Sequence, residues 1–274
     1  MGTKVNPKGF RLGQATNWDS NWRAANKLEF SKKFHLDLQV KELINTTLNY
    51  RGIIVGKLFI REIYSGSSLL VVKGTYYVTP NFFSKLKKEQ GISNINILNE
   101  GIHDLIQREV QTNLEKFVFE YGLDYKVELD LTNVLNLGYN HSLEIIRTSE
   151  QKLKGPLSKA GYVKDLYLIC HKMILLKDTT MFGNTIVPLL EKTTGHHMII
   201  TNIEKICNIV FNQYKGINGL RLDFKGRIGG SARSRSKSFT LGSLSNQQID
   251  SNMSYSFHES VTRYGVCSLK IWLC

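Results

Sequence analysis

LRLDFKGRIGGSARSRSKSF, residues 220–239, alternates charged and uncharged side chains on both sides of two glycines. Residues two apart in a strand point to the same face, so the arm before the glycines should place its cations on one face and its apolar residues on the other. The cations are Arg221, Lys225 and Arg227. The apolar residues are Leu220, Leu222 and Phe224. The pattern predicts a strand with one buried apolar face and one basic face toward solvent.

The arm after the glycines is basic as well. It carries Arg233, Arg235 and Lys237 at alternate positions, separated by serines. Gly229 and Gly230 tolerate positive φ and predict the turn of a hairpin. We expect this hairpin to bring the two rows of cations within about 5–7 Å of each other, where they repel unless anions lie over them. Phosphate groups are suitable anions, and the alternative is an ordinary solvated face.

The composition favours the same kind of partner. Lysine and arginine number 36 against 23 acidic residues in a chain of 274, which gives a formal charge of +13. Such an excess favours a polyanion, with nucleic acid first and an anionic membrane surface second. No apolar run approaches the roughly 18 residues that a spanning helix needs, so no membrane span is predicted. The cysteines form no CxxC pair and indicate core thiols in a reducing compartment.

Residues 35–136 predict a compact α/β domain. Apolar residues recur at helical spacing in its first part and at period two in its strands. The expected elements, in chain order, are a helix beginning at Leu36, strands at 57–63 and 69–78, helices at 81–89 and 103–121, and a strand at 125–134.

Three further segments complete the chain. Residues 1–34 predict a basic arm, whose two tryptophans either stack on bases or anchor the arm to a domain. Residues 137–183 are interpreted as an insertion or spacer, in which Leu166–Leu176 forms a buried strand or a short helix. Residues 184–274 predict helices followed by the hairpin and a last strand, so the fold class is α+β.

Little in the sequence supports catalysis. The chain has no GxxxxGK[ST], GxGxxG or GxSxG motif, and the adjacent pair His196-His197 is poorly spaced for a metal on a helix. We therefore predict no enzyme activity, no cofactor and no metal. RGIIVGKLFI, residues 51–60, is similar to the I-G-x-x-G loop of RNA-binding KH domains, but Phe59 stands where the second glycine belongs.

Three blocks resemble one family, that of the third small-subunit ribosomal protein, which lies in the head beside the mRNA entry. Residues 219–239 are similar to its G-R-[LI]-G-G hairpin, and YGVCSLKIWL, residues 264–273, to its Y-G-V-x-x-[VL]-K-[VI]-W ending. MGTKVNPKGFRLG, residues 1–13, is similar to its N-terminal block. The blocks lie at opposite ends of the chain.

The resemblance implies a short arm, a type II KH-like domain, and a C-terminal α/β domain with helices packed on a mainly antiparallel sheet. It also implies binding to small-subunit rRNA in the head, with the tenth and fourteenth small-subunit proteins as neighbours and mRNA as a further candidate partner. The expected rRNA-binding residues are Lys4, Lys8, Arg11, Arg221, Lys225, Arg227, Gly229, Gly230, Arg233, Arg235 and Lys237.

The sequence also departs from the family. No GxxG motif occurs in residues 76–85, where the KH loop is expected, so the domain is predicted to lack this clamp. No arginine lies between Arg147 and Arg221, although the family has an arginine-rich helix there. Together with the richness in Asn, Ile, Lys, Tyr and Phe, these departures favour a mitochondrial member, with a plastid or the bacterial cytoplasm as alternatives. A nuclease and a free single-stranded RNA-binding KH protein are the alternative functions.

Overall fold

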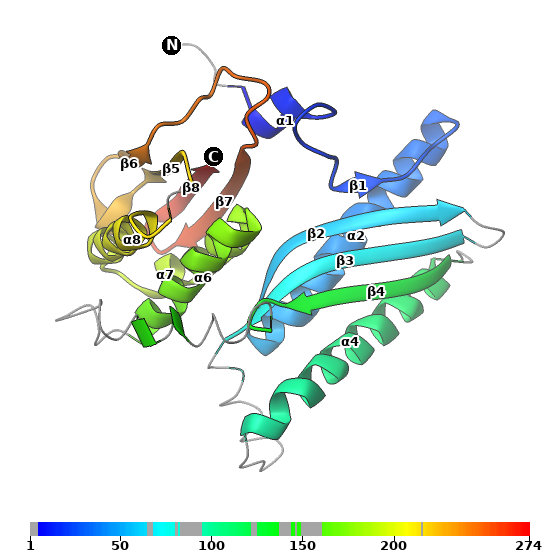
Figure 1. Ribbon diagram of the computed structural model, residues 1–274. Coiled ribbons are helices and arrows are strands. Elements are labelled where there is room, and N and C mark those ends of the chain that lie inside the picture. Colours follow the sequence, from blue (N-terminus) through cyan, green and yellow to red (C-terminus); the bar gives the residue numbers. More distant parts are fainter. Residues whose placement is uncertain are drawn as a thin grey trace. The chain divides into compact units, whose positions relative to one another are not determined.

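The structure is a computed structural model that divides the chain into two compact units, residues 18–137 and residues 1–17 together with 138–274 (Figure 1). Each unit is described by itself. The residues described are 5–64, 68–79, 82, 95–121, 125–136, 144–145, 147–148, 161–214 and 216–274, with the backbone alone for 95–100.

The unit of residues 18–137 is a sheet with the strand order β1-β2-β3-β4 and two long helices. β1 pairs parallel with β2, β2 pairs antiparallel with β3, and β3 pairs parallel with β4. Both helices contribute to one apolar core with the sheet. The elements are β1 (Ser20–Asn21), α2 (Lys27–Arg51), β2 (Ile53–Tyr64), β3 (Ser68–Val78), α4 (Ile95–Glu120) and β4 (Tyr125–Asn133).

The packing of helix α2 on the sheet is explained by apolar side chains that recur every four residues. Leu36, Val40, Ile44 and Leu48 recur on the face that packs on the sheet, and all four are buried. Burying each of them contributes about 1.5–3 kcal/mol. The helix ends at Arg51 and is capped by Gly52, whose φ is 83° and whose N–H donates to Asn49 O at 2.9 Å.

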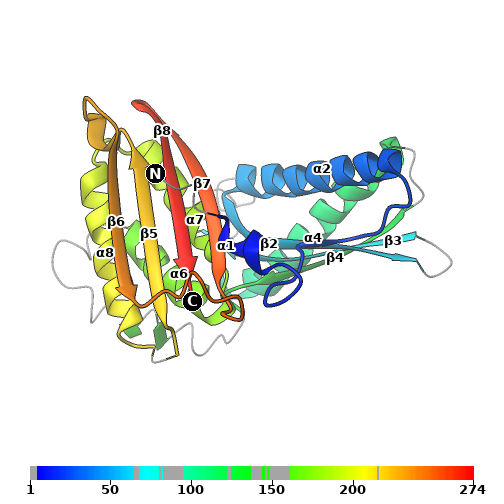
Figure 2. The same cartoon turned by 90° about the horizontal axis from the view of Figure 1, so that it is seen from above.

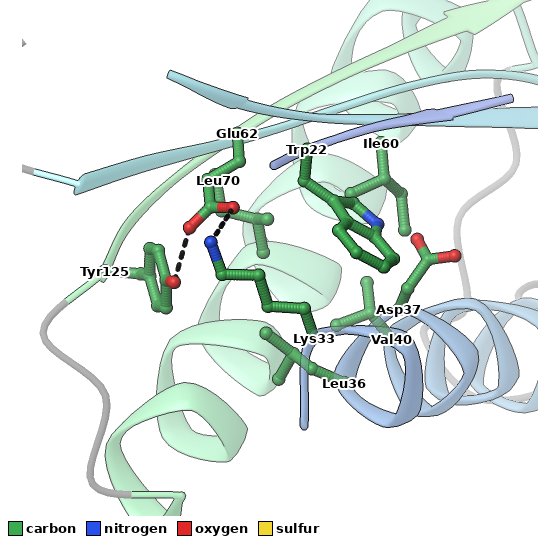
Figure 3. A pocket seen from close by; sticks show the side chains of 9 residues that line it. All are labelled: Trp22, Lys33, Leu36, Asp37, Val40, Ile60, Glu62, Leu70 and Tyr125. Carbon is green, nitrogen blue, oxygen red and sulfur yellow. Dashed lines mark hydrogen bonds and ion pairs between the residues drawn. The ribbon is translucent and has the colours of Figure 1, made fainter. Parts of the chain in front are cut away.

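A polar cluster anchors the start of α2 to the sheet, so residues that were expected in the basic arm belong to this unit. Figure 3 shows Lys33 reaching from α2 toward Glu62 on β2, and the two charged atoms are 3.0 Å apart. Lys33 Nζ also contacts Glu29 at 3.0 Å and donates to Arg23 O at 2.6 Å. The Tyr125 hydroxyl donates to the same Glu62 carboxylate.

Both charges of this ion pair are removed from water. The side chains of Lys33 and Glu62 are 11% and 4% exposed. Desolvation lowers the pKa of Lys33, but hydrogen bonds with Tyr64, Glu29 and Glu62 outweigh it and hold that pKa above its usual value. The nearby indole of Trp22 packs on Phe30 with ring centroids 5.3 Å apart, which makes Trp22 an anchor of this segment.

Replacing Lys33 by methionine should destabilise the protein strongly, because the Glu62 carboxylate would remain buried without its positively charged partner. We expect a loss of about 3 kcal/mol in the free energy of unfolding by urea. Lys32→Met, at an exposed position one residue earlier, should change it by less than about 0.5 kcal/mol. Equal stabilities of the two variants would contradict the structural role of Lys33.

The second unit is an antiparallel sheet with the strand order β6-β5-β8-β7, and Figure 2 shows its helices on one face. Short helix α1 packs beside β7. The elements are α1 (Pro7–Arg11), α6 (Tyr162–Leu176), α7 (Thr179–Lys192), α8 (His196–Phe211), β5 (Gly219–Gly226), the 3₁₀ turn η2 (Ile228–Gly230), β6 (Arg235–Gly242), β7 (Ser254–Thr262) and β8 (Gly265–Leu273).

The end of the expected spacer is part of this unit. Residues 166–176, whose period could not distinguish a strand from a helix, lie in α6, and α6 packs against α7 and α8. Its buried residues run almost without interruption from Val163 to Ile174, which explains the absence of a clear amphipathic period. The described part of residues 137–183 therefore contributes helices to the core of the C-terminal unit.

Arg11 has a structural role that differs from the expected contact with RNA. Its side chain is fully buried, and Nη2 donates to the carbonyl oxygens of Ser245, Asn246 and Gln248 at 3.1, 3.1 and 2.6 Å. Nη1 donates to Pro7 O at 3.0 Å. The guanidinium thus joins the N-terminal segment to the chain between β6 and β7, because its fixed fork of donors can serve several carbonyls at once. The expectation that Arg11 faces RNA is wrong.

His258 is a half-buried base between the sheet and α7. Its ring lies against Gly183, where an added Cβ would come within 2.1 Å of the imidazole. Burial lowers the pKa of His258 to about 4, although the nearby Asp178 carboxylate opposes this shift. The imidazole is therefore neutral in the folded protein at neutral pH.

Acidification should destabilise the fold through His258. As the pH falls below about 6.5, the unfolded chain takes up a proton there that the folded chain accepts only near pH 4. This difference should remove about 3 kcal/mol from the free energy of unfolding between pH 7 and pH 4. His258→Gln should show a shallower pH dependence over the same range, measured by urea unfolding. An unchanged pH dependence in that variant would contradict the neutral state of His258 in the folded protein.

Candidate nucleic-acid interface

The register between β5 and β6 sends the two basic rows to opposite faces of the sheet. Lys225 stands opposite Ser236, and Phe224 stands opposite Lys237. Directly opposite residues share a face, so Lys237 lies on the helix-covered side with Phe224, and Lys225 lies on the other side. Lys237 Nζ accordingly approaches Glu204 of α8 at 3.7 Å. The expectation that the two rows of cations repel each other across the hairpin is wrong.

Arg221 is paired within the sheet. Its Nε and Nη2 atoms donate to the two carboxylate oxygens of Asp223 at 2.9 and 3.0 Å. Its guanidinium carbon also lies 5.3 Å from the ring centroid of Trp272. The Asp223 side chain is only 8% exposed, so this bidentate contact compensates a buried carboxylate. Arg221 therefore has less charge to offer a polyanion than the sequence pattern predicted.

The two glycines form a turn that packs tightly on its own unit. Gly229 and Gly230 have φ values of 64° and 76°, in the left-handed region that glycine favours. The Gly229 N–H donates to His196 Nδ1 at 3.1 Å, at the start of α8. A Cβ on Gly230 would lie 3.1 Å from the Tyr264 ring. Contacts inside the unit therefore require glycine at these two positions, whether or not the turn also approaches RNA.

Exposed arginines gather where this turn meets the turn between β7 and β8. The end of β5, the start of β6 and the β7–β8 turn lie at one end of the sheet, as the pairing of β5 with β6 and β8 requires (Figure 2). We call the four exposed arginines there the arginine end: Arg227, Arg233, Arg235 and Arg263. Arg227 Nε donates to Ser231 O at 3.0 Å, which orients its guanidinium.

The arginine end is strongly basic because its strands contribute few acids. The sequence contains no aspartate or glutamate between Asp223 and Asp250. Lys225, exposed at the end of β5, extends the positive charge onto the sheet face turned away from the helices. Arg263 was missed by the sequence analysis, although it directly precedes the Tyr264 of the C-terminal block and lies in a short turn where a side chain is readily exposed.

The remaining expected site residues lie elsewhere. Lys4 is outside the described residues, and Lys8 is half-buried on α1, whose N-terminus is capped by the Asn6 side chain. Arg11 and Lys237 make the contacts described above. The structure therefore brings together Lys225, Arg227, Arg233 and Arg235 around the glycine turn, and separates them from the N-terminal residues of the set. That these residues bind rRNA stays a prediction.

The described residues contain no group of three or more His, Cys, Asp or Glu side chains placed to hold a metal ion. Cys170 and Cys207 are buried with their sulfur atoms 4.0 Å apart, and burial raises the pKa of the Cys207 thiol. Such thiols are poor nucleophiles. Among the helices of the described ranges, none is both long and apolar enough to cross a membrane.

In a comparison with known proteins, a family model matches the region that carries the arginine end. Residues 198–273 match the family model of the ribosomal protein S3 C-terminal domain. Small ribosomal subunit protein uS3 of Geotalea daltonii is 24% identical over 271 residues, 99% of this chain and 95% of the relative. That of Aquifex pyrophilus is 23% identical over 274 residues, 100% of this chain and 88% of the relative. That of Fusobacterium nucleatum reaches 51% over 53 residues, 19% of this chain and 24% of the relative.

These matches and the α+β fold identify the class of protein as small-subunit ribosomal proteins. Within that class, residues 198–273 match the S3 C-terminal domain, and the relatives that align with nearly the whole chain are uS3 proteins. The resemblance seen in the three sequence blocks is confirmed, as is the expected C-terminal domain of helices on a mainly antiparallel sheet.

Proposed function

We propose that this chain is a structural constituent of the small ribosomal subunit and that it binds rRNA in the head through the arginine end. One observation supports this most directly. Arg227, Arg233, Arg235 and Arg263 are exposed together in the segment that matches the S3 C-terminal domain. Guanidinium groups bind phosphate oxygens by two parallel hydrogen bonds, and the paired strands of the sheet carry these four groups at or just beyond one of its ends.

The relatives give the alternative functions no support, because they carry the name of a small ribosomal subunit protein. The role is therefore one of binding and positioning without a chemical step. Each arginine that neutralises a phosphate releases condensed counterions, so affinity for rRNA should fall steeply with salt. The packed glycine turn reduces the entropy lost on binding, since the backbone between β5 and β6 is already fixed.

Residues 18–137 are proposed to be a type II KH-like domain. Its chain order of helix, two strands, a later helix and a closing strand supports this, as does the arrangement of β2, β3 and β4. The connection in which a KH loop belongs runs from Thr79 to Asn94, and only Thr79 and Phe82 of it are described. With no GxxG in the sequence there, the domain is proposed to dock as a whole, without clamping a strand of RNA.

The neighbours and the compartment are proposed from the same family resemblance. The tenth and fourteenth small-subunit proteins would be neighbours in the head, and mRNA would pass nearby. The chain's abundance of Asn, Ile, Lys, Tyr and Phe supports a mitochondrial ribosome. The relatives compared are bacterial, which supports the bacterial cytoplasm as the alternative compartment.

Sedimentation tests the proposed function. The chain, tagged at its C-terminus and expressed in its own cells, should travel with the small ribosomal subunit in a sucrose gradient. Digestion of the rRNA should release it to the top of the gradient, because its retention depends on RNA. Recovery of the chain only among free proteins, with intact subunits in the same gradient, would contradict the proposal.

The arginine end makes a quantitative prediction about salt. Arg233→Ala combined with Arg235→Ala should weaken binding to head rRNA and flatten the slope of log affinity against log salt by about 1.4–1.8. The control is Lys116→Ala with Lys126→Ala, two exposed lysines of the other unit, which removes the same net charge. Equal slopes for the two double variants would show that the effect is one of total charge.

A further inference from the structure

The face of the C-terminal sheet turned away from the helices carries a row of one cation and two aromatic rings. Arg221, Trp272 and Tyr255 stand directly opposite one another across β5, β8 and β7. The Arg221 guanidinium lies 5.3 Å from the Trp272 ring centroid, and the Trp272 and Tyr255 rings are 5.3 Å apart. The row therefore runs continuously over three strands.

A second row lies beside the first, two residues along each strand. Asp223, Lys270 and Phe257 stand opposite one another, and Lys270 Nζ lies 5.6 Å from the Phe257 ring centroid. Phe257 is 48% exposed. Its neighbour His258 points to the other side, under Gly183 of α7, which fixes Phe257 on the face away from the helices.

This face is unusual for a solvated sheet because large apolar groups remain exposed on it. Val261 and Val266, which stand opposite each other farther along β7 and β8, are 70% and 56% exposed. Such groups on an open sheet face mark an interaction surface. The serines and threonine of β6 on the same face are small and leave the rings accessible from above.

We propose that Phe257 is a stacking platform for a base of single-stranded RNA, and that Lys270 and Lys225 bind phosphates of the same strand. The proposal rests on the proposed function and adds a second mode of contact to it. Sequence-tolerant recognition of unpaired RNA commonly combines an exposed ring with adjacent cations, because every base has a face that can stack.

The charge of the surface favours RNA over a protein partner. Lys225 is exposed on the same strand and face as Arg221 and leads to Arg227 at the arginine end, so positive charge continues from that end onto the face. The acidic residues that β5, β7 and β8 place on this face are Asp223 and Glu259. The charge of Asp223 is compensated by Arg221, so Glu259 is the acid that reduces the positive charge of the surface. A duplex keeps its bases stacked inside, so an isolated ring selects an unpaired strand.

Two variants of the full chain test this inference with an unstructured 12-nucleotide oligouridine and an RNA duplex as probes. Phe257→Leu should weaken binding of the single strand about 5- to 100-fold, because one base–ring stack is lost. Its salt slope and its affinity for the duplex should not change, since no phosphate contact is removed. Phe257→Tyr keeps an aromatic face and should bind like the natural chain.

The outcomes separate this inference from the proposed function. The Phe257→Leu variant could bind oligouridine as tightly as the natural chain while the Arg233/Arg235 double variant shows the flatter salt slope. That result would overturn the stacking platform and leave the proposed function standing. Equal weakening for strand and duplex would overturn it as well. A photoreactive phenylalanine analogue at position 257 should crosslink to RNA in assembled small subunits, and crosslinks to protein instead would show that this face binds a protein.

Discussion

The pairing of Phe224 with Lys237 is the constraint on which the basic surface depends. It sets odd-numbered residues of β5 opposite even-numbered residues of β6, so cations that share the odd numbers in both strands are sent to different faces. The helix-covered side receives Lys237, which approaches Glu204, and the open side receives Lys225 beside the Arg221–Asp223 pair. The arginines that remain accessible are those at the end of the sheet, where the strands give way to turns.

Buried charged groups then hold the rest of the chain to the two sheets. Arg11 donates to three carbonyl oxygens between β6 and β7, and Lys33 occupies a polar cluster with Glu62 in the other unit. Both residues lie in the N-terminal segment that the sequence predicted to be a basic arm. A basic side chain near a chain end therefore has two possible roles, and only its burial distinguishes the structural one from contact with a polyanion.

Much of the fold was accessible from local patterns, while the site was only partly so. Strands β2, β3 and β4 and the glycine turn have clear periods or turn residues, and these persist in the structure. The sequence could not show whether the two basic rows share a face of the sheet. Alternation shows which residues of one strand share a face, but the register between two strands depends on the loop that joins them, here residues 227–234. α6 was ambiguous because it is buried nearly all round, and Arg263 was missed because a turn has no period.

Arginine-specific modification by phenylglyoxal, measured residue by residue in the free protein and in its complex with head rRNA, tests the central claim most directly. Arg235 should react quickly in the free protein and be protected by RNA, because it is exposed and offered to phosphate. Arg221 should react slowly in both states, because Asp223 and the Trp272 ring already hold it. Equal reactivity of the two arginines in the free protein, or an Arg235 left unprotected in the complex, would contradict the claim.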